Sequence, residues 1–161
     1  MKIKTIAVNG IIAALYIAIT GIIQPIAFSQ IQFRIPEMFN HLIVFNKKYF
    51  FGIVLGVFLA NLFFSDLLPY DLYFGVAHSI ICLSLTILIS TFVKNVWARM
   101  IVNTLIFSGM MFIIAYELNL AIGLPFWETW LFTAIGEFVV MAIGAPLMKA
   151  IDARVKFEKM M

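Results

Sequence analysis

Residues 71–93 read DLYFGVAHSIICLSLTILISTFV, and Asp71 is the only Asp, Glu, Lys or Arg in this run. At 1.5 Å per residue, an α-helix of this length crosses the hydrocarbon core of a bilayer. Four further apolar segments, at residues 4–24, 49–65, 97–118 and 127–149, meet or approach the same length. The sequence therefore predicts a helical protein that crosses a membrane several times.

The composition of the whole chain also indicates an integral membrane protein. Of its 161 residues, 64% are hydrophobic and only 12% are charged, and the mean hydropathy is +1.07. A soluble domain of this size could not bury that much apolar surface. Cys82, His41 and His78 make a poor metal set, so we expect no metal and no other cofactor. The first apolar run shows no cleavage site, and we interpret it as a transmembrane helix rather than a signal peptide.

A sixth segment, residues 36–46, is apolar but too short to span a bilayer. As a helix it rises only about 16 Å. Backbone that does not span at membrane depth persists only where it packs in protein or lines a cavity, so this segment indicates a binding site. The predicted fold is a compact all-α bundle of six transmembrane helices with a short second helix, forming one membrane domain over residues 1–161.

The basic residues set the predicted topology. Cytoplasmic loops of membrane proteins are enriched in Lys and Arg, and six helices with both termini in the cytoplasm place every basic residue except Arg34 on that side. The net charge of +3 therefore predicts contact with anionic lipid headgroups and not with nucleic acid. Because Arg34 is isolated on the outer side, we expect it to contact a ligand.

Acidic residues gather in the outer half of this predicted bundle. An ionisable side chain within a span costs about 2.5–3.5 kcal/mol on insertion scales and by default marks a functional site. Glu137, in the middle of the last helix, is the costliest. Arg34 alone cannot neutralise Glu37, Asp71, Glu117 and Glu137, so the surplus predicts a ligand that donates hydrogen bonds or carries positive charge. A purely structural Arg34–Glu137 pair is the alternative.

Aromatic and polar residues near the same side complete the predicted site. Phe126 and Trp127 are placed to stack on a planar ligand, whereas Trp130 is more typical of an interfacial aromatic belt. The candidate substrate-binding residues are Gln32, Arg34, Glu37, Asn61, Asp71, His78, Asn103, Glu117, Phe126, Trp127 and Glu137.

Two of the predicted helices carry small residues at a spacing of four. These are Gly10, Ala14 and Ala18 in the first helix, and Gly52, Gly56 and Ala60 in the third. Such stripes let helix backbones approach closely in lipid. Packing within the bundle is the simpler interpretation of each stripe, and docking of another membrane subunit is the alternative.

Motifs of catalysis are missing from the sequence. It contains no nucleophile elbow and no phosphate-binding glycine loop with lysine. We therefore expect a protein that is not an enzyme and that cannot itself hydrolyse ATP, so any ATP-driven work needs a partner.

Five motifs follow one another in a characteristic order. They are Gln32-Phe33-Arg34-Ile35-Pro36-Glu37, Gly52-x-x-x-Gly56-x-x-x-Ala60-Asn61, Asp71-x-x-x-Gly75, Tyr116-Glu117, and Leu124-Pro125-Phe126-Trp127 ahead of Gly136-Glu137. This order resembles the QueT family over essentially the whole chain. QueT members are substrate-binding S components of energy-coupling factor (ECF) transporters, associated with the uptake of queuosine precursors.

The resemblance implies a compact S component in a bacterial plasma membrane. It would capture its substrate outside, dock on one transmembrane scaffold subunit with two cytoplasmic ATPases, and topple within the membrane. Gly10, Ala14 and Ala18 would then meet the scaffold, and the first loop, with Gln32 and Arg34, would cap the pocket. The implied substrate is a 7-deazaguanine such as preQ1, preQ0 or queuine.

The chemistry of a 7-deazaguanine matches the residues found above. One carboxylate can accept its ring N–H and exocyclic amine together, and Glu137 is favoured for this edge. Arg34 or Gln32 would donate to the carbonyl, and Glu117 or Asp71 would hold a cationic aminomethyl arm. Two alternatives stay open, namely an S component for another vitamin or nucleobase and a stand-alone ion-coupled secondary transporter that uses Glu137 as its ion site.

Overall fold

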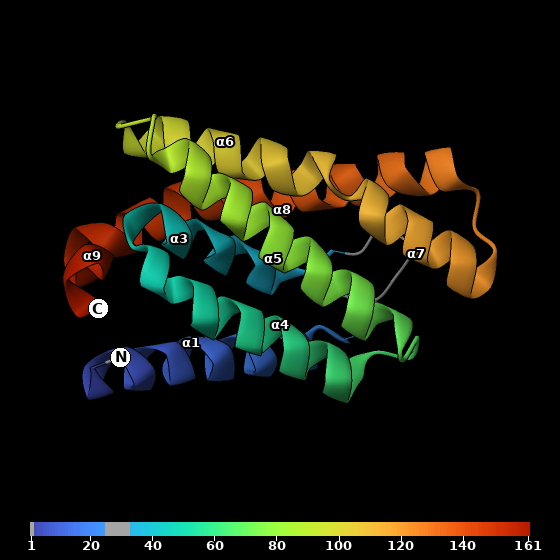
Figure 1. Cartoon of the computed structure of the whole chain (residues 1–161), viewed down its shortest axis with the longest axis horizontal. Coiled ribbons are helices and arrows are strands. Elements are labelled where there is room, and N and C mark those ends of the chain that lie inside the picture. Colours follow the sequence, from blue (N-terminus) through green and yellow to red (C-terminus); the bar gives the residue numbers. More distant parts are fainter. Residues whose placement is uncertain (1, 25–32) are drawn as a thin grey trace.

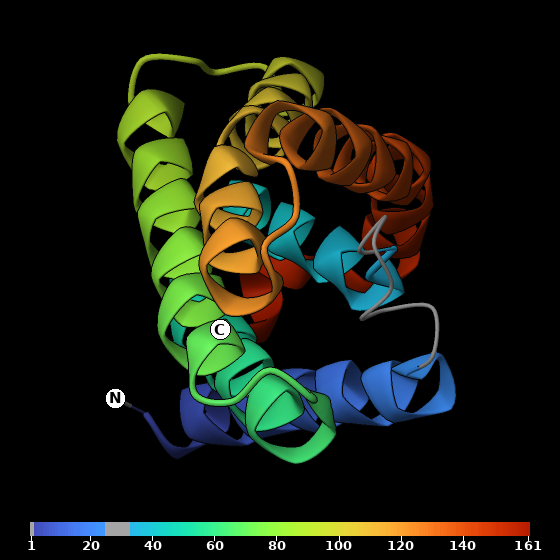
Figure 2. The same cartoon turned by 90° about the vertical axis from the view of Figure 1, so that its right-hand side faces the viewer.

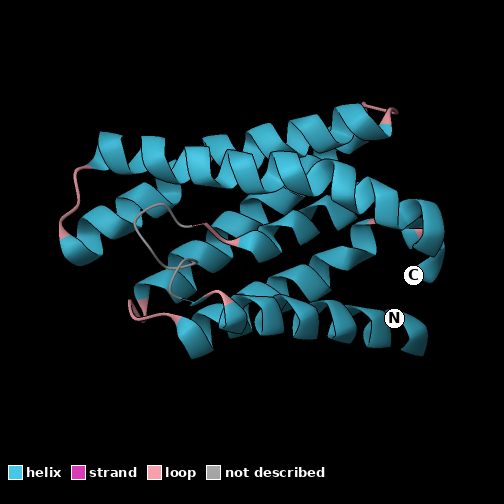
Figure 3. Cartoon of the chain, turned by 180° about the vertical axis from the view of Figure 1, so that it is seen from behind, coloured by secondary structure: helices cyan, strands magenta, loops and turns pink. Residues whose placement is uncertain are grey.

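The structure is a computed structural model, and it describes residues 2–24 and 33–161. Every regular element in these two ranges is helical, which confirms the predicted all-α class. The elements are α1 (Ile3–Ile22), the 3₁₀ helix η1 (Ile35–His41), α3 (Leu42–Phe45), the 3₁₀ helix η2 (Lys47–Tyr49), α4 (Phe50–Phe64), α5 (Tyr70–Ser90), α6 (Val96–Gly109), α7 (Phe112–Ile122), α8 (Phe126–Val155) and α9 (Phe157–Met160). The longer helices run along a common direction and are joined by short loops (Figure 3).

Five segments are long and apolar enough to cross a membrane: Ile3–Ile22, Lys47–Phe64, Tyr70–Ser90, Val96–Ile122 and Phe126–Val155. They coincide with the five long segments predicted from the sequence. The predicted short helix is present as η1 followed by α3, outside these spans, so the count of six transmembrane helices stays a prediction. Both termini lie at one end of the bundle, which we call the terminal end (Figure 1). The α4–α5 and α7–α8 connections lie at the opposite, distal end.

The short helical segment η1–α3 lies in the middle of the bundle, surrounded by the longer helices (Figure 2). Pro36 stands in the first turn of η1, where its missing N–H costs nothing. η1 packs against α8 and α1, and α3 against α5 and α6. At Gly144 of α8, a Cβ atom would lie 2.5 Å from Cβ of Met38, so η1 can sit this close only against glycine. Packed protein thus encloses the non-spanning backbone, as its depth in a membrane requires.

The helix predicted over residues 97–118 is in fact two helices, α6 and α7, separated by a turn at Met110 and Met111. The N–H of Ile113 donates to the Met110 carbonyl at 3.0 Å. This leaves the Gly109 carbonyl to accept from Trp130 Nε1 at 3.1 Å. Glycine weakens a helix at this point. The turn directs α7 away from α6 and onto α5 and α8 (Figure 1).

The two stripes of small residues have different environments. In α4, Gly52 donates its backbone N–H to Asn9 Oδ1 at 2.8 Å, and a Cβ on Gly52 would lie 2.8 Å from the Asn9 carbonyl oxygen. The α4 stripe therefore packs against α1. In α1, Gly10, Ala14 and Ala18 are exposed, and a Cβ added to Gly10 would meet no atom of the described chain within 4 Å. For this stripe, the expectation of packing within the bundle was wrong.

Gly52→Ala is expected to destabilise the protein by about 1–3 kcal/mol, because the new methyl group must push the α1 backbone away at Asn9. Gly10→Ala is the matched control, and it should leave stability unchanged or slightly higher because alanine favours helix. Thermal unfolding of both variants in detergent measures the difference. Equal melting temperatures would contradict the close contact of α1 with α4.

Candidate binding site

Buried polar side chains from six elements and the segment before η1 point into the bundle between its middle and its distal end. Each is at most 8% exposed, in a chain whose outer faces are apolar. Polar groups at membrane depth face the bundle interior or a cavity and find partners there. The members are Tyr16, Arg34, Glu37, Asn40, Asn61, Asp71, His78, Glu117 and Glu137.

Arg34, Asn61 and Asp71, three of the predicted site residues, form the first network. Arg34 pairs with Asp71, with 3.2 Å between Nη2 and Oδ1, and its Nη1 donates to Asn61 Oδ1 at 3.5 Å. Asn61 Nδ2 donates to the Asp71 carbonyl at 2.9 Å, and the Ser65 hydroxyl donates to Asp71 Oδ2. A Cβ on Gly75 would lie 2.6 Å from Asn61 Nδ2, so glycine leaves room for this network. It ties the segment before η1 to α4 and α5.

Glu37 is the centre of a second network between η1 and α1. Tyr16 donates its hydroxyl to Glu37 Oε1 at 2.6 Å, and Asn40 Nδ2 donates to Oε2. Both oxygens of Glu37 thus have partners. Sequence reasoning missed Tyr16 as a site residue, although the polar residues Asn9, Tyr16 and Thr20 recur along the buried face of α1. That periodicity was the available signal.

Asn103 belongs to a third network, which links α5, α6, η1 and α8. Thr86 donates to Asn103 Oδ1 at 2.7 Å, and Asn103 Nδ2 lies 3.4 Å from His41 Nδ1. His41 Nε2 in turn lies 2.9 Å from the Met141 carbonyl. These hydrogen bonds give Asn103 and His41 a structural role in holding η1. The other histidine, His78, faces the Phe107 carbonyl at 3.3 Å.

Glu117 and Glu137 are buried carboxylates of a different kind. Glu117 is 0% exposed and Glu137 is 2% exposed. Within residues 2–24 and 33–161, three of their oxygens have no hydrogen-bond partner, namely both oxygens of Glu117 and Oε1 of Glu137. Glu117 lies beside Asp71, and the two carboxyl groups can hydrogen-bond only if one of them carries a proton. Glu117 and Glu137 both interact electrostatically with Arg34. Buried polar atoms without partners are costly, so these oxygens are candidates for contact with a ligand.

The sequence as a whole matches one family. The QueT transporter family model matches residues 6–153. A curated relative, the queuosine precursor transporter QueT of Lactococcus lactis subsp. cremoris (strain MG1363), is 32% identical over 167 residues, which cover 98% of this chain and 98% of the relative. This chain belongs to the QueT transporter family. No solved structure matches it.

The aromatic residues predicted for this QueT-family site lie at the start of α8. Phe126, Trp127 and Trp130 form one cluster, with ring centroids 5.1 Å apart for Phe126 and Trp127 and 5.9 Å apart for the two tryptophans. Trp127 is 72% exposed and faces the outside of the bundle. Stacking of Phe126 and Trp127 on a ligand stays a prediction. Gln32, the remaining predicted contact, lies outside the described residues.

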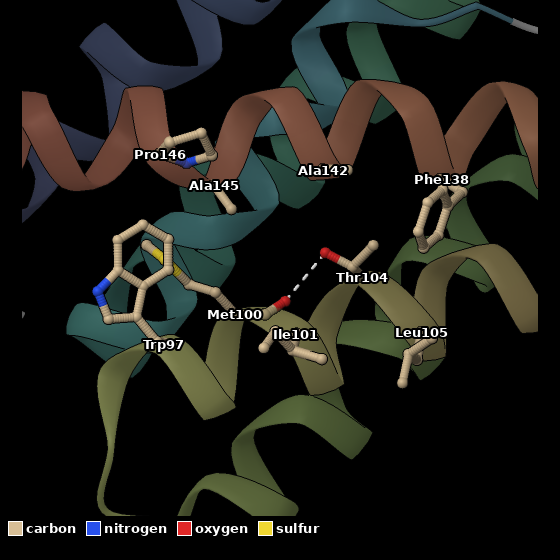
Figure 4. Close-up of a pocket in the computed structure, with 9 residues that line it drawn as sticks. All are labelled: Trp97, Met100, Ile101, Thr104, Leu105, Phe138, Ala142, Ala145 and Pro146. Atoms are coloured by element: carbon tan, nitrogen blue, oxygen red, sulfur yellow. Dashed lines mark hydrogen bonds between the residues drawn. The ribbon is translucent and has the colours of Figure 1, made fainter.

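An apolar groove runs between α6 and α8 on the outer surface of this QueT-family bundle. Its part nearer the terminal end has a volume of about 290 Å³ and lies between Trp97 and Phe138 (Figure 4). There the Thr104 hydroxyl donates a hydrogen bond to the Met100 carbonyl of its own helix at 3.0 Å. The distal part, of about 550 Å³, reaches Trp127. The groove thus offers apolar contacts, and none of the buried carboxylates lines it.

Proposed function

We propose that this QueT-family chain is the substrate-binding S component of an ECF-type importer for a queuosine precursor, a 7-deazaguanine such as preQ1, preQ0 or queuine. The observation that carries the proposal is the pair of buried carboxylates beside Arg34, Glu117 and Glu137, which have oxygens without a hydrogen-bond partner among residues 2–24 and 33–161. The match to a relative named as a queuosine precursor transporter supports the class of substrate.

The hydrogen bonds within the protein indicate which of the acidic residues could bind the ligand. Asp71 and Glu37 have partners on both carboxylate oxygens. Glu137, whose Oε1 has no partner among the residues that the structure describes, would accept the ring N–H and exocyclic amine of the base. Glu117, neither of whose oxygens has a hydrogen-bond partner in the described part of the chain, would hold a cationic arm, and this favours it over Asp71. Arg34 or Gln32 would donate to the carbonyl of the base.

The exposed stripe of α1 supports docking on an ECF scaffold subunit. Gly10, Ala14 and Ala18 face outward, so another membrane helix could approach α1 closely along this line. The gathering of both termini at one end supports a topology with both on the cytoplasmic side of a bacterial plasma membrane. The two ATPase subunits would act from that side, and the chain would deliver its substrate by toppling.

Ala14→Leu is expected to lower uptake about tenfold while leaving substrate binding and thermal stability intact, because the larger side chain keeps the scaffold helix at a distance. A loss of about 1.4 kcal/mol of docking free energy would lower docking tenfold. Val139→Leu, an enlargement on the exposed face of α8, is the control and should transport normally. If Ala14→Leu transports as well as Val139→Leu, the stripe does not dock on the scaffold.

Uptake of labelled 7-aminomethyl-7-deazaguanine tests the proposed function. We expect uptake by cells that express this chain together with an ECF energising module, and no uptake when either is missing. Proteoliposomes that hold the chain alone under an ion gradient provide the second arm. Uptake there would favour the secondary-transporter alternative. Failure of the folded chain to transport in both arms would contradict the proposal.

A further inference from the structure

Two cavities adjoin at the terminal end of the bundle, where α4 and α6 begin and α5 ends. The first, of about 220 Å³, is lined by Lys47, Arg99 and the hydroxyl-bearing residues Ser90 and Thr91. The second, of about 340 Å³, is lined by Lys47, Lys48, Phe50, Phe51 and Ile87. The first cavity also has apolar walls, formed by Ile43, Val44, Phe45 and Ile87. Because Lys47 and Ile87 line both cavities, a cavity of mixed lining that holds two basic side chains opens directly beside an apolar one.

The basic residues of these cavities lack acidic partners. Over residues 2–24 and 33–161, ion pairs form between Arg34 and Asp71 and between Lys149 and Asp152. Lys47, Lys48 and Arg99 therefore have no carboxylate oxygen within 4.0 Å in that part of the chain. Arg99 is nevertheless held in place, since its Nη1 donates to the Val44 carbonyl at 3.4 Å and its Nε donates to the Val93 carbonyl.

A general preference for basic residues in cytoplasmic loops does not explain this arrangement. That preference concerns the side of the membrane and is satisfied by lysine anywhere in the loops. Here Lys47 of η2 and Arg99 of α6, far apart in the sequence, converge on one cavity. Next to it, Phe50 and Phe51 begin the span of α4, so the apolar wall leads from the end of the bundle toward the membrane interior.

We propose that the two cavities together bind one anionic phospholipid. Its phosphate would lie against Lys47, Lys48 and Arg99, with the Ser90 hydroxyl as a further hydrogen-bond donor, and one acyl chain would follow Phe50, Phe51 and Ile87. Basic pockets between transmembrane helices recognise anionic headgroups in this way. The adjoining apolar cavity selects a lipid over a free anion. This site is separate from the carboxylates at the other end of the bundle and does not depend on the identity of the transported substrate.

Lipid binding by the purified full-length chain in neutral detergent tests the proposal. Dioleoyl phosphatidylglycerol should raise the melting temperature and stay bound in native mass spectrometry, whereas dioleoyl phosphatidylcholine should do neither. Lys47→Gln/Lys48→Gln should lower the apparent affinity for phosphatidylglycerol roughly 30-fold. The control Lys156→Gln/Lys159→Gln removes the same charge from residues that line neither cavity and should bind as the unmodified chain does.

A second pair of variants keeps the test informative if the lysine variant folds poorly. Ser90→Glu places a carboxylate in the cavity that holds Lys47 and Arg99 and should prevent phosphatidylglycerol binding, while the neutral Ser90→Gln should retain it. Equal binding of the two lipids, or an equal loss in both lysine variants, would overturn the proposal. Stabilisation by inorganic phosphate as strong as that by phosphatidylglycerol would overturn the assignment to a lipid.

Discussion

Glu137→Gln is expected to abolish binding of a 7-deazaguanine. Glu137 is buried and its Oε1 lacks a partner in the described part of the chain, so a ligand that donates two N–H groups would engage it as a carboxylate. Glutamine keeps the shape but replaces one acceptor with a donor that faces the donors of the base. The loss of two charge-assisted hydrogen bonds, about 1.5–3 kcal/mol each, weakens binding more than roughly 100-fold.

Calorimetric titration of Glu137→Gln beside the unmodified chain measures this loss. Glu128→Gln makes the same chemical change at an exposed position of α8 and serves as the control, with binding unchanged. Glutamine is neutral and costs less to bury than a carboxylate, so Glu137→Gln should unfold at the same temperature or higher. A loss of binding with retained stability separates recognition from folding. Binding by Glu137→Gln within a few-fold of the unmodified chain would refute its role.

Arg34→Met is expected to destabilise the protein by about 3–5 kcal/mol, because it removes one partner of a buried ion pair. Among the residues that the structure describes, Arg34 is the only lysine or arginine that is buried. It pairs with Asp71 and interacts electrostatically with Glu37 and Glu117. Methionine fills much of the same space but leaves these carboxylates without a compensating charge.

A double-mutant cycle with Asp71 isolates the ion pair within this effect. Arg34→Met/Asp71→Leu should recover part of the stability that Arg34→Met loses, because no unpaired Asp71 charge remains. The other ion pair of the described chain, Lys149–Asp152, is the comparison, with Lys149 37% exposed. Lys149→Met should cost at most about 1 kcal/mol. Unfolding in detergent that gives Arg34→Met and Lys149→Met the same small cost would contradict a structural role for the Arg34 pair.

The sequence predicted the spans because long apolar runs and short loops leave few choices in a bilayer. It could not predict the break between α6 and α7, since the hydropathy is continuous across Met110 and Met111. It also could not separate the stripe that begins at Gly10 from the one that begins at Gly52. Both have the same spacing, and which one packs inside depends on how α1 is rotated against α4.

Part of the candidate site could also be predicted. Ionisable side chains are costly in contact with lipid, so those at membrane depth must face the interior of the bundle. This cost predicts that Arg34, Asp71 and Glu117 lie inside the bundle, where the structure buries all three. The pairing among them depends on distances of a few ångströms that spacing does not encode. Tyr16 was missed because tyrosine commonly lies at membrane interfaces and shows its role only when Glu37 is found within 2.6 Å.

Titration calorimetry of the purified full-length chain with 7-aminomethyl-7-deazaguanine and with guanine tests the proposed recognition most directly. We expect the deazaguanine to bind tightly and guanine weakly, because guanine offers the same base edge but no cationic arm for Glu117. Thermal shifts with the same ligands should follow the same order. The absence of binding heat for 7-aminomethyl-7-deazaguanine, its nitrile analogue and queuine, in protein shown to be folded, would contradict the proposed substrate class.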